Sequence, residues 1–241
     1  EQNHLRHFIA LPKALGFEVY QKGGAHIINT SLATSMFNIV YGSTNMATKQ
    51  IIKQFQGQPF AWWIPPSLKT PELIEKLTQD GLVAETTEHA MICNLNTSQS
   101  TQDKQSKLKI KQVQNNHDLQ DFIKIIEAYD PLARKFYTQL NNTNFNFYCE
   151  QLFVGYANEQ PVTIATLFLA QNSAAIFSLI TIDSQRRKGY GTDMMRHLLH
   201  LAKSHGANYA TLSSSGDGGY NIYQNLGFSK IAEFECLEYK P

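Results

Sequence analysis

The sequence is poor in charge and in long apolar runs. Charged residues make up 17% of the 241 residues, and the formal net charge is +1 at pH 7. A nearly neutral chain has no broad electrostatic footprint for nucleic acid or for an anionic membrane surface. No apolar run approaches the roughly 20 residues that a membrane-spanning helix needs. We therefore expect neither nucleic acid nor a membrane as a partner.

Cysteine is also scarce. Cys93, Cys149 and Cys236 are odd in number and widely spaced. This pattern favours reduced, buried thiols over a disulfide framework. The first residues show no basic stretch followed by an apolar stretch and a small-residue cleavage site, as a secretory signal would. We expect a soluble, cytoplasmic protein.

One polar segment divides the chain. Residues 96–107 contain no apolar side chain, which is typical of a linker or an exposed loop. Hydrophobic residues make up 42% of the sequence, so a core can be buried on either side of this segment. We predict an N-terminal α+β domain over residues 1–95, a linker over 96–107 and a C-terminal domain over 108–241.

The C-terminal part alternates between strand and helix patterns. Apolar residues at helical spacing predict a helix behind a cap at Asn115 or Asn116, a second helix over residues 194–202, and a short third one that Gly227 ends. The nearly unbroken apolar run 174–182 is typical of a central strand covered on both faces. Strands are predicted at 108–113, 152–156, 162–170, 174–182, 209–213 and 228–239.

The N-terminal part also reads as α+β. Thr70 is the expected N-cap of a helix with Pro71 in its first turn and Gly81 at its end. Trp62 and Trp63 are neighbours in a predicted strand and should face opposite sides. Helices are predicted at 31–39 and 46–55, and strands at 60–64 and 90–95.

A turn rich in glycine and basic residues follows the apolar run 174–182. It contains Arg186-Arg187-Lys188-Gly189-Tyr190-Gly191 and leads into the predicted helix. A strand-to-helix turn can point unpaired backbone N–H groups at an anion, and glycines let the backbone approach it. A dinucleotide site would need a longer GxGxxG pattern and an acidic residue about 20 residues on. The turn fits a phosphate site or a plain glycine-rich connection.

Two segments together resemble the GCN5-related N-acetyltransferases. Residues 181–191 are similar to the acyl-CoA loop of that family, whose pattern is Arg or Gln-x-x-Gly-x-Gly or Ala. Downstream, residues 222–228 are similar to its tyrosine-containing helix and Gly-Phe exit. The resemblance covers residues 108–239. It implies an α+β (α/β layered) GNAT fold, with a mixed, mostly antiparallel central sheet flanked by helices.

The resemblance implies acetyl-CoA as co-substrate and no metal. Leu179, Ile180 and Thr181 would lie along its pantetheine arm, and Tyr223 would protonate the departing thiolate. Arg186 would add positive charge beside the phosphate-binding amides. The residues that this match assigns to the phosphates are Arg186, Arg187, Lys188, Gly189, Tyr190, Gly191 and Thr192.

The general base is not evident. Attack of a neutral amine on a thioester needs a deprotonated amine, an oxyanion stabiliser and an acid for the sulfur. A tyrosine hydroxyl, with an ordinary pKa of about 10, suits the last role. Many family members carry a glutamate on the central strand or the next one, but residues 176–181 and 209–213 contain no acid. A water chain through Thr181, Ser213 or Ser214, or the side chain of Glu150, stays open as the base.

The sequence does not identify the amine acceptor either. Residues 129–148 take the place where the family shapes its acceptor pocket, and their aromatic side chains suit either a cleft for an amine or ordinary core packing. These aromatic residues are Tyr129, Phe136, Tyr137, Phe145, Phe147 and Tyr148. His197 and His200 have helical spacing with no acid or cysteine beside them, so we expect no metal there.

The N-terminal half, through residues 59–66 and the Pro71 helix, resembles the non-catalytic half of two-part acetyltransferases. This implies a smaller, degenerate GNAT-like domain that completes the acceptor cleft or forms a homodimer surface. The predicted function is transfer of an acetyl group from acetyl-CoA to a primary amine of a small molecule or peptide by direct attack. The missing strand acid leaves a coenzyme A-binding sensory or regulatory module without turnover as an alternative, and a protein-recruiting scaffold as a third.

Overall fold

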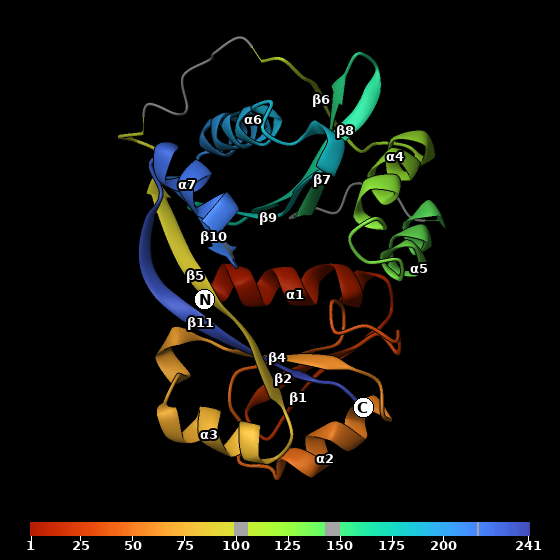
Figure 1. Ribbon diagram of the computed structural model, residues 1–241, viewed down its shortest axis with the longest axis vertical. Coiled ribbons are helices and arrows are strands. Elements are labelled where there is room, and N and C mark those ends of the chain that lie inside the picture. The colour runs from red at the N-terminus through yellow and green to blue at the C-terminus, as the bar shows by residue number, and fades with distance from the viewer. Residues whose placement is uncertain (99–105, 143–149, 216) are drawn as a thin grey trace. The chain divides into compact units, whose positions relative to one another are not determined.

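The computed structural model describes residues 1–98, 106–142, 150–215 and 217–241. These residues form two compact units, one of Glu1–Ala90 with Ala232–Pro241 and one of Met91–Ile231 (Figure 1). The division differs from the expected domains of 1–95 and 108–241. It falls inside a strand, and the end of the chain belongs to the first unit. The described ends of the expected linker, 96–98 and 106–107, belong to the second unit.

Unit 1 (Glu1–Ala90 and Ala232–Pro241) has a sheet with strand order β1-β2-β3-β4-β11-β5. Its helices are α1 (Gln2–Ala14), α2 (Thr48–Ile52) and α3 (Pro71–Gln79). Its strands are β1 (Glu18–Lys22), β2 (Ala25–Asn29), β3 (Ile39–Tyr41), β4 (Phe60–Ile64) and the parts of β5 (Val83–Asn94) and β11 (Ser229–Tyr239) that fall in this unit. β5 and β11 contribute residues to both units.

The two faces of the unit 1 sheet bury separate cores. Trp62 packs with α2 and α3 residues, whereas Trp63 packs on the other face with Phe8 of α1. The expected alternation of the two tryptophans is confirmed. Thr70 caps α3, since its hydroxyl accepts a hydrogen bond from the Leu73 N–H at 3.2 Å. The helical segment predicted at 46–55 is present as α2 and a following 3-10 turn.

The helix predicted at residues 31–39 is wrong. Residues 31–38 form an irregular turn before β3, and Ser31 adopts a left-handed φ of +57°. The amide of Asn38, which is fully buried, organises this turn. It accepts from the Thr30 N–H at 3.0 Å and donates to the Leu32 and Pro59 carbonyls. These buried side-chain bonds replace the backbone bonds of a helix.

Unit 2 (Met91–Ile231) has a mixed sheet with strand order β5-β10-β9-β8-β7-β6. Neighbouring strands from β6 to β9 are antiparallel, while β9 and β10 are parallel. Its strands are β6 (Lys109–Gln112), β7 (Glu150–Ala157), β8 (Gln160–Leu169), β9 (Ser173–Thr181) and β10 (Tyr209–Ser214). Its helices are α4 (Asn116–Ile126), α5 (Ala133–Tyr137), α6 (Tyr190–Ser204) and α7 (Asp217–Asn225). The predicted mixed, mostly antiparallel sheet flanked by helices is confirmed.

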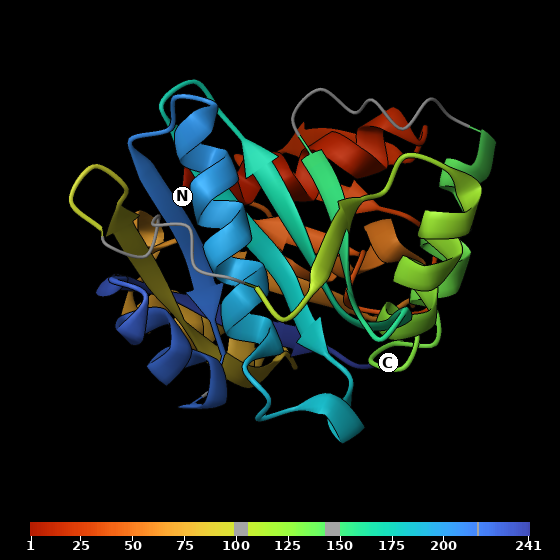
Figure 2. The same ribbon diagram turned by 90° about the horizontal axis from the view of Figure 1, so that it is seen from above.

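Helix α6 lies along the sheet of unit 2 in the view from above (Figure 2). Its apolar stripe, which includes Met194 and Leu198, is fully buried against β7, β8 and β9. Gly155 of β7 permits this approach, because a Cβ there would lie 2.7 Å from Thr163 Cγ2 and 3.3 Å from Met194 Cε. In the described residues no helix is both long enough and apolar enough to cross a membrane.

The expected helix ends of unit 2 are also present. The Asn115 side chain accepts from the Asp118 N–H at 3.0 Å and so caps α4. Gly227 follows α7 with φ +89°, a left-handed conformation that glycine adopts without cost. The chain thereby turns from α7 into β11.

Candidate functional site

Strands β9 and β10 pair only at their beginnings. Parallel pairing joins residues 209–211 to 173–175, although β9 continues to Thr181 and β10 to Ser214. On its other side β9 pairs with β8 along its length, to Thr181 opposite Thr163. The second half of β9 therefore has one edge that no described strand covers. Such an edge can pair with an extended ligand as an additional strand would.

A bulge lies where the side chains of β9 change from buried to half-buried. The register with β8 shifts between Ile164 and Thr166, and Ser178 of β9 has φ +51°. An extra residue of this kind bends a strand and redirects its side chains. Residues 174–176 are buried, whereas 177–181 are half-buried. The expected coverage of the run 174–182 on both faces therefore fits residues 174–176, whereas the side chains of 177–181 are only partly covered.

The loop after β9 is closed by its own side chains. Arg186 donates from Nε to the Thr181 carbonyl at 3.1 Å and pairs through Nη2 with Asp183 Oδ1 at 2.8 Å. Lys188 Nζ donates to Gln185 Oε1 at 2.7 Å. Arg187 and Gly189 have left-handed φ values of +61° and +89°. Arg186, expected to add charge for a phosphate, already has a carboxylate partner in the turn.

The first turn of α6 begins directly behind this loop. The first intrahelical bond near its start runs from the Asp193 N–H to the Gly189 carbonyl at 3.0 Å. The N–H groups of residues 190–192 precede it, and such N–H groups at a helix start together with the helix dipole favour an anion. A Cβ on Gly191 would lie 3.6 Å from Thr181 Oγ1 and 3.9 Å from Leu179 Cδ2. The fold thus brings Leu179 and Thr181 of β9 beside Gly191 of α6.

The hydroxyl of Thr181 is fixed by a short chain of bonds. It donates to Thr163 Oγ1 at 3.0 Å, and Thr163 Oγ1 donates to the Ile180 carbonyl at 2.9 Å. Thr163 is fully buried. Thr181 can therefore serve a water chain only through its lone pairs, because its proton is already engaged.

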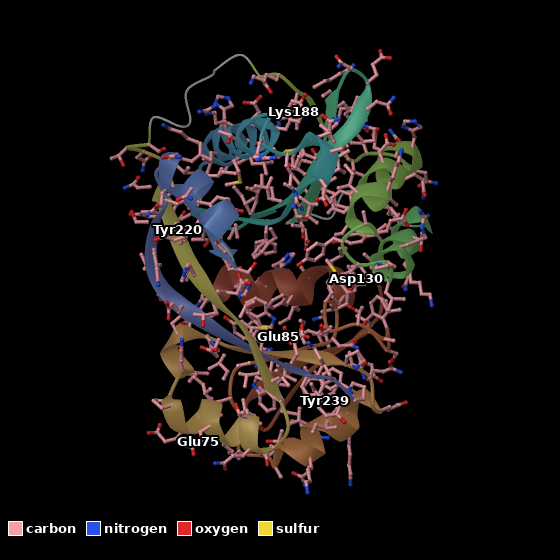
Figure 3. The ribbon with its side chains drawn as sticks, viewed as in Figure 1. Glu75, Glu85, Asp130, Lys188, Tyr220 and Tyr239 are labelled. Carbon is pink, nitrogen blue, oxygen red and sulfur yellow. The ribbon has the colours of Figure 1, made fainter. Side chains whose placement is uncertain are left out.

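Tyr223 lies on α7, which Tyr220 marks in Figure 3. Its half-buried ring packs on the core of α6, which Leu179 of β9 also contacts. The ring meets Phe228 edge to face, with 6.0 Å between centroids. Tyr223 and the second half of β9 thus border the same core.

The aromatic residues of segment 129–148, which was expected to shape an acceptor pocket, differ in their burial. Phe136 and Tyr137 are buried, and Tyr137 packs against Phe122 of α4 with ring centroids 5.1 Å apart, so core packing is the role that fits them. Tyr129 is 72% exposed. The other three aromatic residues, Phe145, Phe147 and Tyr148, lie outside the described residues.

Glu150 begins β7 and is 4% exposed. Burial, and then the negative charge of Glu150, raises the pKa of the Tyr137 hydroxyl. Among the base candidates from the sequence, Ser214 is also buried and Ser213 is half-buried. In the sheet Glu150 lies opposite Phe168 of β8, one strand away from β9.

The histidines of α6 do not come together with other ligands. His197 is half-buried beside Phe153, and burial followed by the charge of His200 lowers the pKa of its ring. Over the described ranges no three His, Cys, Asp or Glu side chains are grouped to hold a metal ion.

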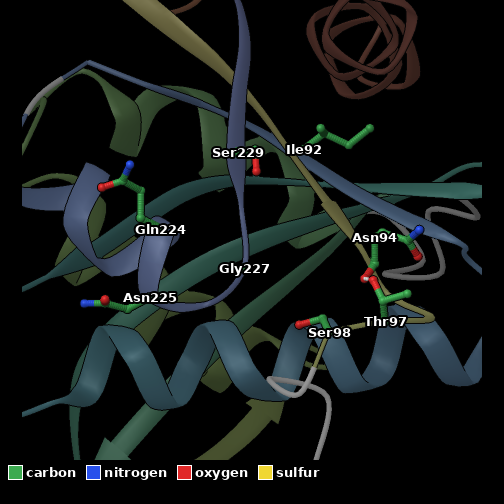
Figure 4. A pocket seen from close by; sticks show the side chains of 8 residues that line it. All are labelled: Ile92, Asn94, Thr97, Ser98, Gln224, Asn225, Gly227 and Ser229. Atoms are coloured by element: carbon green, nitrogen blue, oxygen red, sulfur yellow. Dashed lines mark hydrogen bonds between the residues drawn. The ribbon is translucent and has the colours of Figure 1, made fainter.

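A polar pocket of about 590 Å³ lies at the C-terminal end of α7 (Figure 4). It touches the helix of Tyr223 only through Gln224 and Asn225. The lining residues are Ile92, Asn94, Thr97, Ser98, Gln224, Asn225, Gly227 and Ser229. No residue of the predicted cofactor site is in this lining, so the pocket is separate from the loop before α6.

One residue at the loop was missed from the sequence. The Lys107 N–H donates to Asp193 Oδ2 at 2.9 Å, and its Nζ donates to the Lys188 carbonyl at 3.3 Å. Lys107 closes a polar segment with no periodic pattern, 79 residues before Arg186. Nothing in the local sequence signals the contact.

Comparison with known families matches residues 117–228 to "Acetyltransferase (GNAT) family". A stretch of 77 residues is 34% identical to the uncharacterized N-acetyltransferase CgeE of Bacillus subtilis (strain 168). It covers 31% of this chain and 30% of that protein, so the match spans less than a third of the curated relative.

Solved structures share the fold over nearly the whole chain. A GCN5-related N-acetyltransferase from Kribbella flavida aligns with a TM-score of 0.71 at 15% identity, covering 98% of this chain and 95% of that one. A functionally unknown conserved protein from Staphylococcus epidermidis ATCC 12228 aligns with a TM-score of 0.70 at 13% identity, covering 94% and 95%. At these identities the likeness shows the fold alone.

Proposed function

Residues 117–228 form a domain of the acetyltransferase (GNAT) family, and from this premise we propose that the protein transfers the acetyl group of acetyl-CoA to a primary amine of a small molecule or peptide. The observation that carries the proposal is the uncovered edge of β9, which leads directly into the glycine-containing start of α6. The pantetheine arm and the pyrophosphate, two adjoining parts of the donor, each have a complementary feature there.

The residues around this edge fit the donor. The backbone of Leu179, Ile180 and Thr181 can pair with the amides of the pantetheine arm, since β10 has parted from β9 at this point. Backbone N–H groups from Arg187 to Thr192 can hold the phosphates without a specific side chain. Gly191 supports this arrangement, because a larger side chain there would project beside Thr181.

The reaction needs two proton movements. As the amine nitrogen bonds to the thioester carbonyl carbon and the carbon–sulfur bond breaks, the hydroxyl of Tyr223 gives its proton to the sulfur. The amine proton leaves to a base, and the product is an amide. Glu150 and a water chain through Thr181, Ser213 or Ser214 are the candidates for that base. A Glu150→Gln variant separates them, because a carboxylate base predicts a large fall in kcat and a water chain through the hydroxyls predicts a kcat near that of the wild type.

Calorimetry with acetyl-CoA tests the donor site. Gly191→Glu should abolish detectable binding, since it places a carboxylate and its side chain at the phosphate-binding amides. Ser204→Glu, at the exposed far end of α6, should bind as the wild type does. Absence of binding by the wild type, or equal binding by Gly191→Glu, would contradict the proposal.

Turnover needs its own experiment. Release of free thiol from acetyl-CoA is measured across a panel of amines, amino acids and peptides, with mass spectrometry to identify the acetylated nitrogen. We expect amine-dependent thiol release that requires an intact donor site. Binding without transfer to any acceptor would instead favour a coenzyme A-binding regulatory module.

A further inference from the structure

Lys107 attaches the end of the polar segment to the candidate cofactor loop. Its backbone N–H and its ammonium both make hydrogen bonds there, to Asp193 and to the Lys188 carbonyl. The ammonium nitrogen also lies 3.6 Å from the position that a Cβ of Gly189 would take. A positive charge from outside the loop thus lies beside Gly189, the residue directly before α6.

Asp193 holds Lys107 in this place. Its carboxylate lies in the first turn of α6, is 12% exposed and accepts the Lys107 N–H at 2.9 Å. Ser106 adds a second restraint, since its hydroxyl accepts the Leu108 N–H at 3.0 Å. Strand β6 then begins at Lys109. One hydrogen bond therefore fixes the Lys107 N–H, and a second one spans Lys107 from residue 106 to residue 108.

The local charges favour an anion beside this ammonium. The start of a helix is the positive end of its dipole, so negative charge is favoured there. Asp193 supplies one carboxylate in the first turn, and its oxygens face the Lys107 N–H and the Arg196 guanidinium. The ammonium groups of Lys107 and Lys188 make their hydrogen bonds to uncharged oxygens, and Arg186 pairs with Asp183 in an exposed ion pair. A phosphate would give the Lys107 ammonium a charged partner and accept its protons.

We propose that Lys107 is a binding residue for a phosphate of coenzyme A, contributed by the segment before β6 rather than by the loop itself. The inference rests on the proposed function, because it requires that the loop binds the coenzyme. Lys107 then acts as a compact charge next to the backbone amides of α6. It recognises the phosphorylated end of the donor and contributes nothing to the acyl end.

A Lys107→Met variant tests this assignment, with Lys109→Met as its matched control. Lys109 is an exposed lysine two residues further on, in β6. Calorimetry with acetyl-CoA at two salt concentrations should show about a tenfold higher Kd for Lys107→Met and a weaker salt dependence, as expected for loss of one phosphate contact. Lys109→Met should match the wild type, and Lys107→Arg should recover most of the affinity.

S-acetylpantetheine, which has the thioester but lacks the nucleotide and its phosphates, separates binding from structural damage. Its kcat/KM should be the same for Lys107→Met and the wild type. An equal Kd for acetyl-CoA in Lys107→Met and Lys109→Met would overturn the assignment, and so would an equal loss with both donors. If the wild type itself did not bind acetyl-CoA, the proposed function would fail instead. Lys107→Gln repeats the comparison with a polar, uncharged side chain.

Discussion

The ring of Tyr223 lies directly over Gly219, one turn earlier in α7. A Cβ on Gly219 would stand 2.9 Å from Cε2 of the ring and 3.3 Å from both Cζ and the hydroxyl oxygen. Real Cβ atoms do not approach as closely as the first of these distances. The tyrosine ring therefore keeps its position only because residue 219 has no side chain.

The hydroxyl of Tyr223 should matter for turnover and not for donor binding. Removing a general acid typically lowers a rate by about 100-fold to 10,000-fold. We expect Tyr223→Phe to lower kcat by at least the smaller factor while the Kd for acetyl-CoA in calorimetry stays near that of the wild type. Tyr220→Phe, on the same helix, is the control and should keep its activity. An unchanged kcat in Tyr223→Phe would remove this residue as the acid.

Gly219→Ala should act through the same hydroxyl. The added methyl group pushes the ring aside, so kcat should fall with little change in donor affinity. Steady-state kinetics of the double variant provide the check. In the Tyr223→Phe background the alanine should cost no further activity, because the hydroxyl is already absent and the two effects are not additive. Independent, additive losses would mean that Gly219 serves the fold and not the position of Tyr223.

The burial of His4 should make the free energy of unfolding decrease as the pH falls. Its ring is 7% exposed and packs on Phe8 and Phe234, with centroids 4.6 Å and 4.5 Å away. Burial, and then the charge of His7, lowers the pKa of His4 well below its usual value of 6.5. As pH falls below 6.5 the unfolded chain binds a proton that the folded chain resists, so stability decreases by up to about 1.4 kcal/mol per pH unit.

Urea unfolding at pH 5 and pH 7.5 measures this dependence. The difference in unfolding free energy between the two pH values should shrink in His4→Phe, which keeps an aromatic ring without a titrating group. His205→Gln changes an exposed histidine and should leave the difference as it is in the wild type. A His4→Phe variant with the full wild-type difference would show that other groups cause it.

The two described cysteines, Cys93 and Cys236, should be inert in the folded protein. Their side chains are buried and form no disulfide with each other. Burial, as the largest effect, raises the pKa of both thiols and so depletes the reactive thiolate. In a Cys149→Ser background, a disulfide reagent should label neither thiol within minutes until denaturant is added. Rapid labelling of the native variant would contradict this burial.

Local patterns predicted most of the elements around the candidate site. The caps at Thr70 and Asn115 and the turn at Gly227 are present, because capping and left-handed turns depend on a few neighbouring residues. The helix expected at 31–39 failed for the opposite reason. The buried Asn38 binds the Pro59 carbonyl, 21 residues away, and no local pattern contains that bond.

Local patterns also fail to predict which charged side chains lie together at the loop. The sequence predicts positive charge from Arg186 beside a phosphate and places Lys107 at the end of a linker. In the structure Arg186 is paired with Asp183, whereas Lys107 reaches the Lys188 carbonyl. Residue type and spacing reveal which groups are charged, but only the three-dimensional structure shows that Lys107 lies beside the loop.

By itself the sequence determined the order of strands and helices in unit 2. It also determined that the loop at 186–191 resembles an acyl-CoA loop and that Tyr223 is the candidate acid. These depend on periodicity and on short motifs within one strand, turn or helix. Only the tertiary structure decided where β9 leaves β10, that the bulge at Ser178 bends it there, and that Lys107 meets the start of α6. Each of these depends on which distant segments pair, and the free energy of that pairing is shared among residues far apart in the chain.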